Sequence, residues 1–193
     1  MPEPPHAARH SDIPVTGVNE VDNADSNARE SMRPMTKEQI VQEIIASLTA
    51  DLELFSIAAK TAHAAATHSE CLPDNKYDTT ALEASYIAQG QANRAQEIRA
   101  ALDSYRTLNL RNFNDDTPIR LTALVTLECA DGNVRRLFLG PQAGGLKISD
   151  RDGEVVVITP VSPLGHRLLG LRNGDEVQAG SDVAQCFTIV AVS

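Results

Sequence analysis

Two stretches of sequence decide the fold: residues 41–66 read VQEIIASLTADLELFSIAAKTAHAAA, and residues 81–105 read ALEASYIAQGQANRAQEIRAALDSY. In both, small and apolar residues recur at alternating steps of three and four, which is the spacing of a coiled-coil seam. When the stretches are paired antiparallel, the position numbers of opposite residues add up to a nearly constant value, which predicts two helices of equal length folded back on each other. The seam residues are Val41, Ile45, Leu48, Leu52, Phe55, Ala59, Ala62 and Ala66 in the first stretch, and Ala81, Ala84, Ala88, Gln91, Ala95, Ile98, Leu102 and Tyr105 in the second.

Signals at the ends of the helices set the bounds of this pair. Thr36 is a good N-cap, and Gln39, three residues later, completes a capping box. Pro73 forbids helical continuation and places the turn between the helices near it. The sequence therefore predicts an antiparallel coiled-coil hairpin over residues 36–110, with its tip at residues 71–79.

The length of this hairpin bears on its use. At about 1.5 Å per residue, each helix spans on the order of 40 Å. A hairpin of that length cannot be packed inside a domain of this size. We therefore expect its distal half to project, and its tip to act on something outside the chain.

The segments on either side of the hairpin have different textures. Residues 1–34 are rich in Pro, Asp, Asn, Ser and Glu and carry few large apolar residues. Such a segment cannot bury enough surface to offset its ordering entropy, and we expect it to be disordered. Residues 111–118 form an Asn- and Asp-containing linker that leads into a second domain, residues 119–193.

This second domain has the pattern of a small β domain. Ser162 followed by Pro163 predicts a helix start, with Ser as the cap and Pro at the first helical position, and Gly170 ends that helix. The predicted fold class is therefore α+β, with the helical hairpin followed by a sheet that carries one short helix. Strands are predicted at residues 121–128, 134–139, 155–158 and 186–192, the first two joined by a turn.

Composition excludes several classes of protein. The chain has 193 residues and a net charge of −9, which argues against binding duplex DNA through phosphate neutralisation. No apolar run is long enough to span a bilayer, and no secretory signal pattern begins the chain. Cys71, Cys129 and Cys186 form no disulfide framework and are typical of a reducing cytoplasm. We therefore expect a cytoplasmic, monomeric protein without a membrane role, which acts on another protein or carries metal-binding carboxylates.

Two further patterns carry weaker alternatives. His63, His68 and Cys71 offer soft-metal ligands, but the spacing of the two histidines does not place them on one helical face, and too few ligands are evident for a zinc site. Gly140–Gly145 is Gly-rich but lacks the Lys-Ser/Thr that follows a phosphate-binding loop, so it is read as an ordinary turn.

Residues 159–177, TPVSPLGHRLLGLRNGDEV, carry a resemblance to a known family. Together with the preceding hairpin, they resemble the Gre family of bacterial transcription elongation factors, whose C-terminal pattern has Ser-Pro, Leu/Ile-Gly, an apolar pair ending in Gly, and then Gly-Asp-Glu-Val. The resemblance extends over about residues 36–193. It implies an FKBP-like C-terminal domain that docks on the rim of the secondary channel of bacterial RNA polymerase, at Ser162, Pro163, Leu164, Gly165 and Asp175.

The resemblance also implies what the tip does. In the family, the coiled coil enters the channel, and tip carboxylates help to hold a catalytic Mg²⁺ that cuts backtracked RNA. The protein would then be no enzyme itself and would have no cofactor of its own. It would share Mg²⁺ with the polymerase and meet nucleic acid only within the transcription complex. Asp74 and Asp78 are the tip residues assigned to this catalytic and metal-binding role.

The tip departs from the family pattern. When Tyr86 is aligned with the tyrosine of the family's tip, Thr79 and Leu82 stand where its two carboxylates should be. Three hypotheses remain open: a factor that stimulates cleavage, a non-cleaving occupant of the channel, and a peptide-binding or prolyl-isomerase-like module. A pocket of the last kind is usually lined by aromatic residues, whereas this domain has only Phe138 and Phe187 besides Phe113 in the linker. The acidic tip residues Glu70, Asp74, Asp78 and Glu83, beside Lys76, also fit an ordinary solvated surface.

Overall fold

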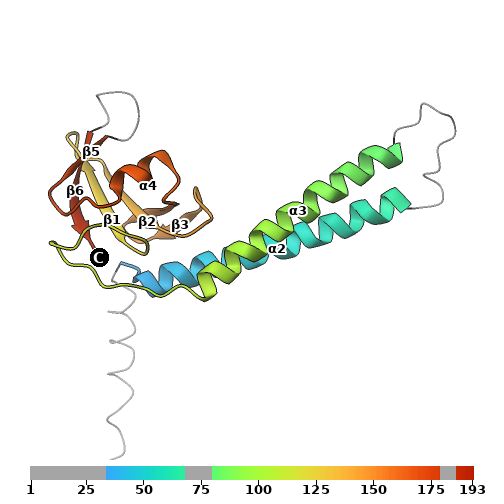
Figure 1. Cartoon of the computed structure of the whole chain (residues 1–193), viewed down its shortest axis with the longest axis horizontal. Helices are drawn as coiled ribbons and strands as arrows, with labels where there is room; N and C mark the ends of the chain where they lie inside the picture. The colour runs from blue at the N-terminus through green and yellow to red at the C-terminus, as the bar shows by residue number, and fades with distance from the viewer. Residues whose placement is uncertain (1–33, 68–79, 179–185) are drawn as a thin grey trace, which may run out of the picture. The chain divides into compact units, whose positions relative to one another are not determined.

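The computed structural model describes residues 34–67, 80–178 and 186–193, which belong to one compact unit, Pro34–Ser193. Two long helices precede a six-stranded mixed sheet with one short helix (Figure 1), which confirms the α+β class. The predicted disordered tail and the predicted tip lie outside the described residues. The elements in chain order are α2 (Lys37–Thr67), α3 (Thr80–Arg106), β1 (Leu124–Cys129), β2 (Val134–Leu139), β3 (Lys147–Asp150), β4 (Gly153–Ile158), α4 (Pro163–Leu168), β5 (Glu176–Gln178) and β6 (Cys186–Val192).

The first helix begins with the predicted capping box. The backbone N–H of Thr36 donates to Oε1 of Gln39 at 2.9 Å, and the backbone N–H of Gln39 donates to Oγ1 of Thr36 at 3.3 Å. Two N–H groups that have no partner inside the helix are thereby satisfied. Local sequence chemistry therefore explains where α2 begins.

The two long helices run antiparallel, so that the beginning of α2 lies beside the end of α3 (Figure 1). Ile40 and Ile44 of α2 share a buried cluster with Leu102 and Tyr105 of α3. Farther along the pair, small side chains, Ala59 and Ala88 among them, line a groove of about 470 Å³. Large residues therefore fill the space between the helices near the sheet, and small ones line it farther out.

Burial follows the predicted seam closely in α3 but less closely in α2. The seam residues of α3 are buried from Ala95 to Tyr105. In α2, the seam residue Ile45 is only partly buried, whereas Ile40 and Ile44, which the heptads leave out, have no exposed surface. The reason is a second contact, because Ile40 and Ile44 also pack against the sheet. Their partners in that cluster include Leu124, Phe138, Ile148, Val155 and Val157.

The strands form one sheet in the order β3-β4-β2-β1-β6-β5. β2 and β4 pair in parallel, and the other neighbouring pairs are antiparallel. The predicted strand 121–128 begins three residues later than expected, because Thr122 has a φ of 79° and its N–H donates to the carbonyl of Leu139. The short edge strands β3 and β5 were not predicted.

Each face of the sheet has its own apolar core. On one face, the cluster that contains Phe138 packs against the bases of α2 and α3. On the other face, Leu168 of α4 packs among residues of β1, β2, β5 and β6. Alternate residues of β2 therefore face different partners, with Phe138 toward the long helices and Leu137 and Leu139 toward α4.

Candidate functional site

The segment that resembles the Gre pattern folds around the start of α4. Ser162 is the N-cap, and its Oγ accepts a hydrogen bond from the backbone N–H of Gly165 at 3.1 Å. The same hydroxyl donates to the carbonyl of Thr159 at 2.7 Å. Pro163 occupies the first turn, where a missing N–H costs nothing. The predicted helix start is confirmed, and Ser162 has a structural role there.

Gly165 also has a structural role, since it is buried where the chain passes close to itself. A Cβ at this position would overlap the carbonyl of Thr159 and crowd Oγ of Ser162. Two of the proposed docking residues, Ser162 and Gly165, are therefore required by the turn itself.

Asp175 shapes the loop that follows α4. Its Oδ2 accepts a hydrogen bond from the N–H of Arg172 at 2.7 Å, and its carbonyl accepts from the N–H of Ile189 at 2.9 Å. Gly174 beside it has a φ of +87°, which L side chains rarely adopt. The Gly-Asp of the pattern therefore ties this loop to β6.

The surface that remains for a partner lies on the outer side of α4. We define the α4 edge as Val161, Pro163, His166, Arg167 and Leu169. Val161 is 91% exposed and Leu169 is 37% exposed, and the other three are also exposed. Leu164, by contrast, is half-buried against the core. Val161, His166, Arg167 and Leu169 were not assigned from the sequence, although they lie within the Gre-like segment around the buried Leu168.

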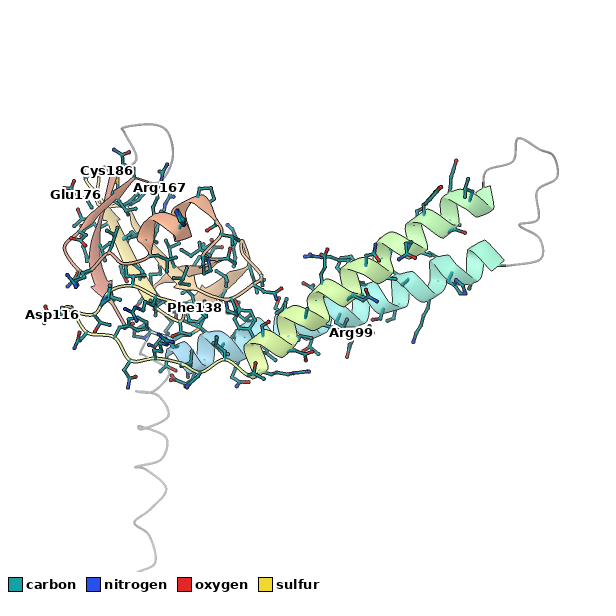
Figure 2. All side chains as sticks on the ribbon, in the orientation of Figure 1. Arg99, Asp116, Phe138, Arg167, Glu176 and Cys186 are labelled. Atoms are coloured by element: carbon teal, nitrogen blue, oxygen red, sulfur yellow. The ribbon has the colours of Figure 1, made fainter. Side chains whose placement is uncertain are left out.

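Arg167 links this edge to the sheet. Its guanidinium Nη1 donates to the carbonyl of Gln178 in β5 at 2.7 Å. Figure 2 shows Arg167 near Glu176 and Cys186, which belong to β5 and β6. Among the described cysteines, Cys129 and Cys186 are both free thiols. Burial, and then the negative charge of Glu176, raise the pKa of Cys186.

A polar contact connects the start of α2 to the sheet. The backbone N–H of Met35 donates to both carboxylate oxygens of Asp150, at 3.1 and 3.2 Å. The guanidinium of Arg136 pairs with the same carboxylate, whose side chain is 1% exposed. Burial alone would raise the pKa of Asp150, but hydrogen bonds from Arg136, Arg151 and Met35 hold it below its ordinary value.

A second contact connects the end of α3 to the loop between β2 and β3. The hydroxyl of Tyr105 donates to the carbonyl of Gln142 at 2.8 Å, and burial raises the pKa of this phenol. A Cβ on Gly140 would overlap that hydroxyl, so the loop can approach the helix only with glycine there. The Gly-rich stretch Gly140–Gly145 therefore has a packing role, and Phe138, labelled in Figure 2, lies in the core beside it.

The tip residues assigned to catalysis and metal binding, Asp74 and Asp78, lie outside the described residues, as do His68 and Cys71. Within the part of the chain that is described, no group of three or more His, Cys, Asp or Glu side chains is arranged to hold a metal ion. None of the described helices is long and apolar enough to cross a membrane.

Comparison with known proteins gives similarities to solved structures alone, since neither a family model nor a curated protein matches the chain. One similar structure is GreA factor homolog 1 (Gfh1) of Thermus thermophilus, with 22% identity and a TM-score of 0.33, covering 79% of this chain and 94% of that one. Another is Gfh1 of Thermus aquaticus, with 23% identity and a TM-score of 0.33, covering 78% and 92%. At these values, the similarities decide nothing about the function of this chain.

Proposed function

We propose that this chain is a transcription elongation factor that binds bacterial RNA polymerase through the α4 edge and inserts the α2–α3 pair into the secondary channel. The observation that carries the proposal is the Gre-like segment 159–177. Its Ser-Pro forms an N-capped helix, and its Gly-Asp forms a loop anchored to β6. The segment resembles the family in sequence, and each of these residues has a definite place in the fold.

The long helices support insertion. α2 has 31 residues and α3 has 27, so they are roughly 45 and 40 Å long. The buried part of the cluster shared with the sheet ends at Leu48 in α2 and begins at Ile98 in α3. Farther out, Ile57 and Tyr86 are 63% and 69% exposed. More than half of each helix is therefore available to a partner.

Two versions of this function differ at the tip. In the first, Asp74 and Asp78 help to hold the Mg²⁺ of the polymerase, a metal that generates the attacking hydroxide in RNA cleavage. In the second, the chain occupies the channel without supporting cleavage. Leu82 favours the second version, because it stands where the family has a carboxylate. Its side chain is 54% exposed near the beginning of α3.

A stalled-complex assay with purified bacterial RNA polymerase tests the proposal. Labelled backtracked RNA reports cleavage, and a pull-down of the polymerase reports binding. Val161→Asp places a charge on the most exposed residue of the α4 edge and should reduce binding at least tenfold. Ala130→Asp, which adds the same charge in the exposed β1–β2 turn, is the matched control and should bind normally. Absence of binding by the wild-type chain would overturn the proposal.

A further inference from the structure

The α4 side of the sheet carries a groove that the proposed function does not use. It has a volume of about 430 Å³ and lies over β2, β4 and β3, beside the first turn of α4. This volume is within the range typical of ligand-binding pockets. Leu137, Val156 and Ile158 form the floor, and Leu164 contributes from α4.

The register of the strands explains why the floor is apolar. Leu137 of β2 lies beside Val156 of β4, and the next residues on the same face, Leu139 and Ile158, lie beside each other as well. Because side chains alternate between the faces of a strand, this places consecutive apolar rows toward α4. Val156 and Leu164 are only partly buried, so part of this apolar surface faces solvent.

Charged residues line the groove one row away from this floor. Lys147 and Glu154 form an ion pair at 2.9 Å with side chains 65% and 46% exposed, so the pair contributes little and rearranges easily. Arg135 is also exposed. Its guanidinium lies 4.9 Å from the ring centroid of Phe187, and no carboxylate of the described residues forms an ion pair with it.

Arg135 thus presents a cation beside an apolar floor, in a chain with a net charge of −9. Stacking on Phe187 holds the planar guanidinium by cation–π attraction and leaves its N–H groups available to a carboxylate. A lysine could supply the charge, but it could not supply the same planar fork. The charge and the floor together suit a ligand that carries a carboxylate next to apolar side chains.

We propose that this groove binds a short peptide segment of a partner protein in which one acidic side chain is flanked by aliphatic ones. The aliphatic side chains lie on Leu137, Val156 and Ile158, and the carboxylate binds Arg135. The proposal is independent of polymerase binding, since the exposed α4 edge and the groove are different surfaces. Leu164 alone belongs to both the Gre-like motif and the groove.

Fluorescence anisotropy with the full chain tests this proposal. The probe is a labelled nonapeptide, Gly-Ser-Val-Asp-Leu-Val-Gly-Ser-Gly, and the matched peptide carries Asn in place of Asp. We expect the acidic peptide to bind at least tenfold more tightly than the Asn peptide. Arg135→Ala should remove this preference, and Arg135→Lys should restore part of it. Arg99→Ala, which removes an exposed cation of α3, is the control and should leave binding unchanged.

Further outcomes decide between occupants. Val156→Asp places a charge on the floor and should abolish binding, with a circular dichroism melt to show that the chain is folded. Equal binding of the two peptides, or binding that Arg135→Ala leaves unchanged, overturns the proposal. So does peptide binding that appears only after residues 1–33 are removed, which would make the chain's own N-terminal segment the occupant. A dimer in sedimentation experiments that Val156→Asp dissociates would make the occupant a second copy, and would also overturn it.

Discussion

The carboxylate of Asp150 in β3 accepts hydrogen bonds from the backbone N–H of Met35, 115 positions earlier in the chain, at 3.1 and 3.2 Å. Arg136 of β2 pairs with the same carboxylate. The residue before the capping box of α2 is therefore held by a buried ion pair of the sheet. This contact, together with the apolar cluster around Phe138, attaches the long helices to the sheet.

Removing the charge of Asp150 should be costly. Asp150→Asn leaves the largely buried guanidinium of Arg136 without its counter-ion, and breaking such a pair costs about 2 to 4 kcal/mol in the free energy of unfolding. Urea denaturation followed by circular dichroism measures this loss. The matched control is Glu154→Gln, which breaks the exposed pair with Lys147 and should cost less than about 1 kcal/mol. Equal losses for the two variants would contradict this account.

The same carboxylate should make stability depend on acid. The pKa of Asp150 is lower in the folded chain than in the unfolded chain, where it takes its ordinary value of about 3.9. Its contribution is therefore fully present above about pH 4 and is lost as the pH falls through the lower, folded pKa. Thermal melts between pH 3 and pH 7 should show a steeper loss for the wild-type chain than for Asp150→Asn. Parallel curves would mean that this group does not contribute to the acid sensitivity.

What the sequence predicts well here is what short-range chemistry decides. Ser162, Pro163 and Gly170 lie within nine positions of one another, and together they set the bounds of α4. The capping box of Thr36 and Gln39 is equally local. The strands β2 and β6 match their predicted ranges because alternation and the adjacent turn signals suffice to bound them.

What the sequence does not predict depends on long-range contacts. Ile40 and Ile44 are buried by the sheet, which a heptad analysis of two helices does not include. The edge strands β3 and β5 have four and three residues, too few for alternation to stand out. The candidate site behaves in the same way: its helix start is local, but the groove beside Arg135 arises only when β2, β3 and β4 are adjacent.

Two glycines should respond oppositely to the same substitution. Gly165→Ala introduces a Cβ that overlaps the backbone carbonyl of Thr159, and it should lower the free energy of unfolding by at least about 2 kcal/mol. At Gly90 in α3, a Cβ would meet nothing within 4 Å. Gly90→Ala should therefore stabilise the chain by about 0.5 to 1 kcal/mol, because alanine is the better helix former. Denaturant titration of both variants measures these changes, and stabilisation by Gly165→Ala would contradict the close approach.

The hydroxyl of Tyr105 should contribute a modest amount to stability. Tyr105→Phe keeps the buried ring but removes the hydrogen bond to the carbonyl of Gln142, which should cost about 1 kcal/mol. Hydrogen exchange of the backbone amides in the loop 140–146 should speed up, with little change in β6. A variant as stable as the wild type, with unchanged exchange, would show that the apolar contacts of the ring hold this loop.

The last prediction separates the two roles that meet at the start of α4. Ser162→Ala removes the N-cap hydroxyl, which accepts from Gly165 and donates to Thr159, so it should cost about 1 kcal/mol of stability. At temperatures where the variant is folded, its affinity for RNA polymerase should be close to that of the wild type, because the half-buried hydroxyl is already bonded within the chain. Val161→Asp should do the reverse, since its side chain is 91% exposed and packs against little of the fold. Stability by denaturant titration and affinity by polymerase pull-down, measured on both variants, test the assignment. If Ser162→Ala loses affinity without losing stability, the hydroxyl contacts the polymerase directly and its capping role is secondary.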